Sequence, residues 1–134
     1  MKPAIKVIGV PNDINSSFMR GSSAAPPLIR EALFSASSNL FSESGLNLDQ
    51  EGVWDDLGDI EFTGEVAVEN FKKIKTFVKD VLVSDQKLVS LGGDHSVSWP
   101  ILDAHLDIWD ALDILHIDAH PDLYDSLLLS LIHI

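Results

Sequence analysis

Short apolar runs alternate with stretches of helical periodicity along the chain, and this alternation limits the possible folds more than any other feature. Apolar runs bounded by Gly, Pro, Asn or Asp predict strands, whereas apolar residues that recur every three or four positions predict helices. The predicted strands are 5–10, 52–59, 87–91 and 114–117, and the predicted helices are 26–33, 65–83 and 96–106. Strands that alternate with helices indicate an α/β fold, and we expect three α/β/α layers around a mainly parallel sheet.

The chain has 134 residues, a formal net charge of −12 and a sequence pI of about 4.5. Its lysines and arginines are scattered singly or in pairs, so we expect no surface that neutralises a run of phosphates and no nucleic-acid partner. This acidity suits a site for divalent cations and a cationic substrate. A surface made for solubility nevertheless accounts for most of it.

Cysteine is absent, which excludes disulfides, thiolate-zinc sites and a cysteine nucleophile. Histidines and carboxylates are therefore the metal ligands to consider. No apolar stretch is long enough to span a membrane, and the run 5–10 is too short for a signal peptide. We expect a cytoplasmic protein that does not enter a membrane.

Two polar motifs follow two of the predicted strands. Gly92-Gly93-Asp94-His95-Ser96 follows the strand 87–91, and Asp118-Ala119-His120-Pro121-Asp122 follows the strand 114–117. In open parallel sheets, ligands bind outside the carboxyl ends of the strands. Each motif alone has a plain interpretation as a cap or a turn, but their succession at strand ends of one sheet favours a shared site.

The spacing within these motifs indicates a ligand set. Asp118, His120 and Asp122 occupy alternate positions, so an extended backbone would turn all three side chains to one face. His95 would add a nitrogen from the neighbouring strand end, where the preceding glycines permit a sharp turn. Two carboxylates with imidazoles fit Mn²⁺, and less specifically Zn²⁺, Fe²⁺ or Co²⁺, better than Ca²⁺. We predict a metal site at these four residues.

A near-copy of the second motif occurs fifteen residues earlier, at Asp103-Ala104-His105-Leu106-Asp107. It falls in or at the end of the predicted helix 96–106. On a helix, Asp103 and Asp107 share a face and His105 points roughly the opposite way, so the three side chains cannot converge. We interpret this copy as chance similarity on a solvated helix surface.

The two motifs in this order resemble the ureohydrolase family of arginases, agmatinases and formimidoylglutamases. The resemblance implies an arginase-like fold and two Mn²⁺ ions per site, with other divalent cations as alternatives. His95 and Asp122 would bind one ion, His120 the other, and Asp118 would bridge the two. The likeness covers nearly all of the chain up to Asp125, through Asn12-Asp13, Arg20-Gly21, 25–33 and Asp56-Leu57-Gly58-Asp59.

The chemistry that the resemblance implies is hydrolysis of a small guanidino or amidino compound to urea and an amine, with a metal-activated water as the nucleophile. Asp94 and Asp125 are candidate supporting groups. His116 shares strand parity with Asp118 and is a candidate hydrogen-bond donor to the ligands. A hydrogen-bonded histidine in the protein interior is the interpretation that we favour for His116.

The chain departs from the family after Asp125. The family's later Ser-x-Asp-x-Asp-x-x-Asp-Pro motif, and its downstream His and Glu for proton transfer and substrate binding, do not follow. No residue present is therefore assigned a catalytic role. We interpret residues 1–125 as the N-terminal part of a single domain that is incomplete at its C-terminus, and we expect this chain alone to be inactive.

Residues 126–134 form an apolar tail that we interpret as foreign to the domain. The stretch Leu129-Ser130-Leu131-Ile132-His133-Ile134 is the translation of a common transposon-derived sequencing adapter, CTGTCTCTTATACACATC. Such a scar contributes nothing to the fold. The alternative is a natural buried strand, which the composition permits, and under either interpretation His133 is not assigned as a ligand.

For the intact parent protein, the resemblance favours a Mn²⁺-dependent amidinohydrolase that forms a homo-oligomer, a trimer or a hexamer. We place it nearer to agmatinase than to arginase, because Leu123-Tyr124-Asp125 lacks the Ile-Asn-Thr-Pro-like run that follows the motif in many arginases. Two other classes remain open: a non-catalytic metal-binding or regulatory homologue, and an α/β binding module with accidental motifs.

Overall fold

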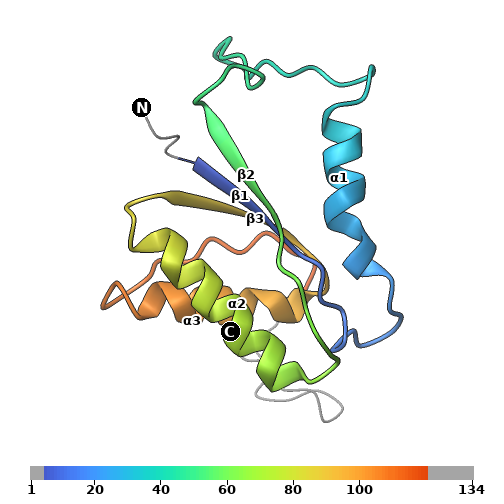
Figure 1. Cartoon of the computed structure of the whole chain (residues 1–134), viewed down its shortest axis with the longest axis vertical. Helices are drawn as coiled ribbons and strands as arrows, with labels where there is room; N and C mark the ends of the chain where they lie inside the picture. Colours follow the sequence, from blue (N-terminus) through green and yellow to red (C-terminus); the bar gives the residue numbers. More distant parts are fainter. Residues whose placement is uncertain (1–4, 121–134) are drawn as a thin grey trace.

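A parallel sheet forms the centre of the computed structural model, which describes residues 5–120. Its strands lie in the order β2-β1-β3, and their bounds are Ile5–Val10 for β1, Trp54–Asp59 for β2 and Lys87–Gly92 for β3. The pairing of β1 with β3 is regular, whereas the pairing with β2 shifts register between Val7 and Gly9. Because all three strands are parallel, their carboxyl ends meet at one edge of the sheet (Figure 1).

Helices cover both faces of this sheet (Figure 1). Helix α1 (Ala25–Leu33) lies on one face, and α2 (Ala67–Leu82) and α3 (Ser98–Leu106) lie together on the other. The short 3-10 helices η1 (Ser22–Ala24) and η2 (His95–Val97) directly precede α1 and α3. The expected three-layer α/β/α fold with a parallel sheet is confirmed. Within residues 5–120, no helix combines the length and apolar character needed to cross a bilayer.

The core lies between the sheet and the pair α2 and α3. Side chains at alternate positions of β1 point toward these helices, since Ile8 and Val10 are fully buried there. Helix α2 buries residues spaced four apart, so one stripe of the helix faces the core. The core members are Ile8, Val10, Ile60, Ile74, Val78, Leu82, Val97 and Ala104.

The predicted strands and helices up to residue 106 are confirmed with small changes at their ends. The predicted strand 114–117 is wrong for the described structure, in which this segment has no regular secondary structure. Leu115 and Ile117 are each 87% exposed. An apolar run becomes a strand only when a neighbour completes its ladder of hydrogen bonds, and no backbone bond described within 5–120 joins this run to β3.

An ion-pair network joins α1 to β2. Arg30 donates from Nε and Nη2 to the two carboxylate oxygens of Asp56, at 2.6 and 2.9 Å, and from Nη1 to Asp59. The hydrogen bond to Asp56 raises the pKa of Arg30 and lowers the pKa of Asp56, so both groups stay charged. The Arg30 side chain is only 19% exposed, which makes this contact stronger than an ordinary surface pair.

Replacing Arg30 with lysine is expected to lower the free energy of unfolding by about 1 kcal/mol, because an ammonium group cannot make the two-pronged contact. Urea denaturation followed by far-ultraviolet circular dichroism measures the change. Arg20→Lys is the matched control, since Arg20 pairs with Glu65 at the surface and its side chain is 52% exposed. Equal changes in the two variants would contradict the prediction.

Candidate metal centre

A glycine allows the turn after β3 to pass close to the loop that follows β1. The backbone N–H of Asp94 donates to the carbonyl oxygen of Asn12 at 2.9 Å. A Cβ atom added at Gly93 would lie 2.0 Å from that oxygen, which is far inside any real contact. Gly93 is therefore required for the two loops to meet at the carboxyl edge of the sheet.

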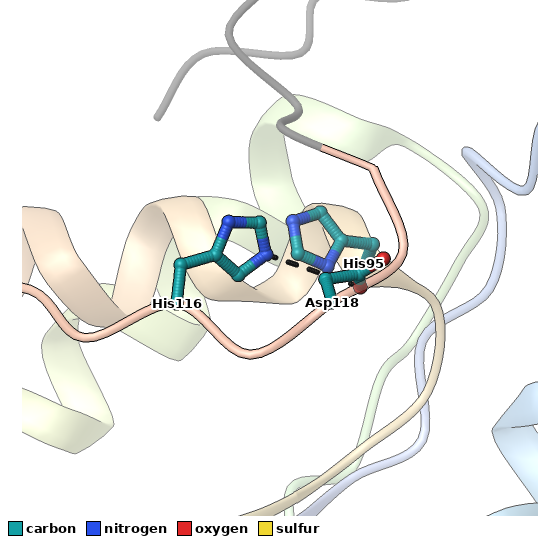
Figure 2. Close-up of side chains that lie close together, drawn as sticks. All are labelled: His95, His116 and Asp118. Carbon is teal, nitrogen blue, oxygen red and sulfur yellow. Dashed lines mark ion pairs between the residues drawn. The ribbon is translucent and has the colours of Figure 1, made fainter.

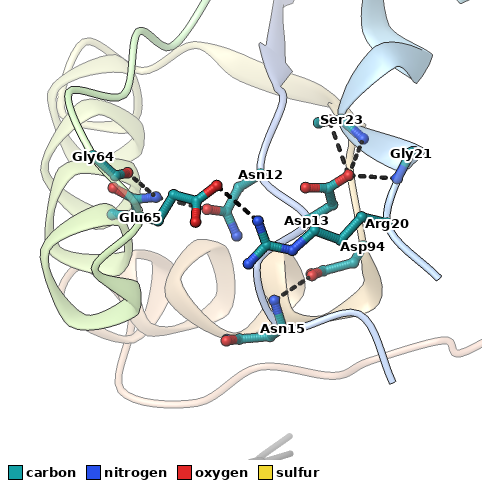
Figure 3. A network of polar contacts seen from close by, with 10 residues as sticks. Asn12, Asp13, Asn15, Arg20, Gly21, Ser23, Gly64, Glu65 and Asp94 are labelled. Carbon is teal, nitrogen blue, oxygen red and sulfur yellow. Dashed lines mark hydrogen bonds and ion pairs between the residues drawn. The ribbon is translucent and has the colours of Figure 1, made fainter. Parts of the chain in front are cut away.

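The side chain of Asp94 fixes the turn that carries His95. One carboxylate oxygen accepts a hydrogen bond from the backbone N–H of Ser96 at 3.0 Å and another from its hydroxyl, which caps η2. The other oxygen accepts from the backbone N–H of Asn15 at 3.0 Å (Figure 3). These bonds tie the first residue of η2, His95, to the loop after β1.

Buried polar groups in turn hold the loop after β1. Asn12 is 2% exposed and Asn70 on α2 is 5% exposed. Nδ2 of Asn70 donates to Oδ1 of Asn12 at 2.8 Å and to the carbonyl of Gly64 at 3.3 Å. Because Asn70 Nδ2 faces two acceptors, the orientation of both amides is fixed, and Nδ2 of Asn12 is left buried without a partner.

Asp13 closes the same loop onto the start of η1. Its Oδ2 atom accepts hydrogen bonds from Gly21 N at 2.7 Å, Ser23 N at 3.2 Å and Ser23 Oγ at 2.9 Å (Figure 3). The bond from the Gly21 N–H is the largest cause of the lowered pKa of Asp13. A carboxylate with these donors remains ionised at neutral pH, although Asp13 is only 8% exposed.

His95, His116 and Asp118 lie together beside the turn (Figure 2). Each of them offers a ligand atom, and these atoms all lie within 4.8 Å of one another. Nε2 of His116 is 3.9 Å from Oδ2 of Asp118, and the rings of His95 and His116 are 5.6 Å apart between centroids. All three residues are exposed, so the preferred interpretation of His116 as an interior histidine is wrong. The segment carrying it stays outside the sheet, which leaves the ring at the surface.

His120 lies at the margin of this cluster. Its side chain is 80% exposed, and its Nδ1 atom is 3.8 Å from Oδ1 of Asp118. The backbone N–H of His120 donates to the same Oδ1 at 3.0 Å. That bond is the main reason that the pKa of Asp118 is lowered. The chain bends at 118–120, so the extended backbone needed to align Asp118 with His120 is absent there. Asp122 and Asp125 lie outside the described residues.

The near-copy at 103–107 does not converge, as predicted. Asp103 and Asp107 share a face and bind Lys75 on α2 at 2.8 and 3.1 Å. His105 instead places Nδ1 2.8 Å from the carbonyl of Ile101 and stacks on Trp109. The prediction that this copy lies on a solvated helix surface is wrong in one respect. This face packs on α2, where Asp107 also binds Lys79, and the two aspartates are only 35% and 32% exposed.

The chemistry of the donor set fits a divalent cation. Two imidazoles and one ionised carboxylate are ligands for borderline ions such as Mn²⁺, Co²⁺ and Zn²⁺. Sequence reasoning missed the contribution of Asn12, Asn15 and Asn70, which hold the His95 turn through contacts between distant parts of the chain. The local signal in the sequence was an asparagine two residues after the end of the strand 5–10.

Comparison with known proteins identifies the family. Residues 3–131 match the model described as the arginase family. The chain belongs to the arginase family. A curated rice protein named "Arginase 1, mitochondrial" (Oryza sativa subsp. indica) is 39% identical to it over 133 residues, which cover 94% of this chain and 39% of the rice protein. An agmatinase from Photorhabdus laumondii is 32% identical over 130 residues, with 90% and 39% covered.

A solved structure agrees with this assignment. The arginase from Medicago truncatula has a TM-score of 0.81 and 37% sequence identity, and the match covers 92% of this chain and 41% of that chain. The chain thus spans 39% of the length of each of the two curated relatives above.

Proposed function

We propose that the whole protein represented by this chain is a metal-dependent amidinohydrolase, which converts a guanidino compound and water into urea and an amine. The observation that carries the proposal is the meeting of His95 with Asp118 beside the carboxyl ends of the strands. These residues come from the two motifs that first indicated the family, and they approach each other across a sequence separation of 23 residues. Family membership supports the reaction class.

In this proposal His95, Asp118, His120 and Asp122 hold two Mn²⁺ ions. Bound Mn²⁺ would supply the Lewis-acid chemistry that activates a water molecule. Asp94 acts on the site through His95, since its carboxylate fixes the turn on which that ligand sits. The lowered pKa of Asp118 keeps this side chain in the anionic form that would bind a cation.

The substrate of the proposed enzyme is a small cation. A cleft of about 550 Å³ borders His95 and His116, a size suited to a small molecule. The net charge of −12 favours the approach of a guanidinium group. We propose agmatine as the substrate, because Leu123-Tyr124-Asp125 lacks the run that follows the motif in many arginases. Arginine is the first alternative substrate, because the rice arginase is the more similar of the two curated relatives above. A cytoplasmic location and a trimeric or hexameric assembly complete the proposal.

The proposal is tested by urea release from the complete protein loaded with Mn²⁺. Agmatine, arginine, guanidinobutyrate and formiminoglutamate are each supplied, and turnover of at least one is expected. His120→Ala is expected to lower the rate at least 100-fold, because it removes a metal ligand. His105→Ala is the matched control, since His105 holds the same place in the near-copy and contacts Ile101 and Trp109 instead.

Different outcomes separate the proposed enzyme from its rivals. Absence of urea from all four compounds, with Mn²⁺ bound to the complete protein, would indicate a non-catalytic homologue. Absence of Mn²⁺ from the complete protein, with no effect of His120→Ala on metal content, would indicate a binding module with accidental motifs. The 134-residue chain alone is expected to release no urea, since it spans 39% of the length of the rice arginase.

A further inference from the structure

A second cleft, of about 520 Å³, lies between β2 and the second half of α2. We propose that this cleft binds a small zwitterion with an apolar body, of the class of apolar α-amino acids. Lys6 and Asp55, which line it, are the second residues of β1 and β2. The cleft therefore lies at the amino ends of the strands, opposite to the metal centre, and the inference does not depend on the proposed function.

The cleft arises where α2 only partly covers the sheet. Lys6 shares with the fully buried Ile8 the side of β1 that faces α2, and its parallel partner Asp55 faces the same way. Strand β2 forms one edge of the sheet, whereas the buried stripe of α2 packs on the core beside β1 (Figure 1). The neighbouring residues Phe77 and Val81 of α2 line the cleft and give it an apolar wall.

Lys6 is unusual because it occupies a core-facing position of the central strand. Its side chain is 15% exposed, and its Nζ atom donates to Oδ2 of Asp55 at 2.7 Å. An ammonium group has three N–H donors, and Asp55 is the acceptor that the described part of the chain provides. A largely buried ammonium group with unused donors favours a ligand that brings an acceptor. A carboxylate makes the strongest contact of this kind.

The groups across the cleft from Lys6 are acceptors. Asp80 is an exposed carboxylate on α2. Gln86 donates from Nε2 to the carbonyl of Ser84 at 3.1 Å, which fixes the orientation of its amide. The Oε1 atom of Gln86 is then buried without a hydrogen-bond partner. This side of the cleft therefore lacks donors, and a ligand ammonium group that pairs with Asp80 would supply them.

The three features together select the ligand class. An apolar α-amino acid brings a carboxylate for Lys6, an ammonium group for Asp80 and an apolar side chain for the wall formed by Phe77 and Val81. A diamine would be repelled by Lys6, and a simple carboxylate would be repelled by Asp80. The volume of about 520 Å³ is within the range of sites for small molecules.

The test is isothermal titration calorimetry of the 134-residue chain with L-phenylalanine, in the presence of EDTA so that no metal ion carries the contact. Two analogues are titrated beside it. Phenethylamine lacks the carboxylate, and 3-phenylpropionate lacks the ammonium group. Each analogue is expected to bind at least about tenfold more weakly than L-phenylalanine, because each loses one charged contact.

Variants assign the two charged contacts. Lys6→Met is expected to abolish the preference for L-phenylalanine over phenethylamine, and Lys6→Arg is expected to retain it. Asp80→Asn is expected to abolish the preference over 3-phenylpropionate. Lys87→Met and Glu69→Gln are the matched controls, since both residues are exposed and neither lines the cleft. The controls are expected to change the affinity less than about twofold.

Preference between ligands is the deciding measurement, because partial unfolding would weaken all three ligands alike. Asp80 is exposed, so Asp80→Asn still tests the cleft if Lys6→Met fails to fold. Failure of the folded 134-residue chain to bind L-phenylalanine would overturn the inference. So would equal affinity for L-phenylalanine and its two analogues, or preferences that stay unchanged in the folded variants.

Discussion

Replacing Gly93 with alanine is expected to lower the free energy of unfolding by about 3 kcal/mol. The added Cβ would meet the backbone carbonyl of Asn12 at 2.0 Å. A flexible side chain could move aside, but this carbonyl is held by the N–H of Asp94. The loops after β1 and β3 must therefore separate, and His95 moves with them.

The neighbouring glycine is the control. A Cβ at Gly92 would meet only a methyl group of Val97, at 3.4 Å, which is close to an ordinary contact. Gly92→Ala is expected to change stability by less than about 1 kcal/mol. Urea denaturation followed by far-ultraviolet circular dichroism measures both variants. Equal stability of the two variants would show that the loops do not meet as described.

Removal of the Asp13 carboxylate is expected to cost about 2 kcal/mol at neutral pH. In Asp13→Ala, the N–H groups of Gly21 and Ser23 lose a charged acceptor. The hydrogen bonds that connect the two ends of the loop between β1 and α1 are then absent. Asp80→Ala is the control, because Asp80 lies exposed on α2. Its substitution is expected to leave the urea midpoint nearly unchanged.

The effect of Asp13 should depend on pH in a stated direction. The folded chain lowers the pKa of Asp13, mainly through the Gly21 N–H, so the carboxylate is favoured in the folded state. Its stabilisation is fully present above the ordinary aspartate pKa of about 3.9 and is lost as pH falls through the lower folded-state pKa. The midpoints of the wild type and Asp13→Ala should therefore converge on acidification below pH ~4. A difference that stays constant as the pH falls well below ~4 would refute this assignment.

Local periodicity sufficed to predict most of the fold. The strand 5–10 and the helix 65–83 carry signals of their own, namely a bounded apolar run and a stripe of apolar residues. The same reasoning correctly rejected the near-copy at 103–107, because helical geometry separates His105 from its neighbouring aspartates. Features of this kind depend on residues that are close in sequence.

The parts that sequence did not predict depend on distant partners. The run 114–117 has the composition of a strand, but it forms one only if its backbone is hydrogen-bonded to a neighbouring strand such as β3. The interior assignment of His116 failed for the same reason, since it presupposed that strand. The hydrogen bond from the backbone N–H of Asn15 to the side chain of Asp94 joins residues 79 positions apart, and no local sequence pattern indicates such a contact.

The position of β1 in the middle of the sheet has a consequence for synthesis of the chain. Translation produces β1 first, whereas its neighbours β2 and β3 begin at residues 54 and 87. The central strand therefore leaves the ribosome with both of its edges unpaired. The loop after β1 cannot form its hydrogen bond to Asp94, in the turn that carries His95, until that turn has also been made. Until β2 has been made, a chaperone or a premature partner can pair with either edge of β1, and the edge that β3 covers stays open for longer.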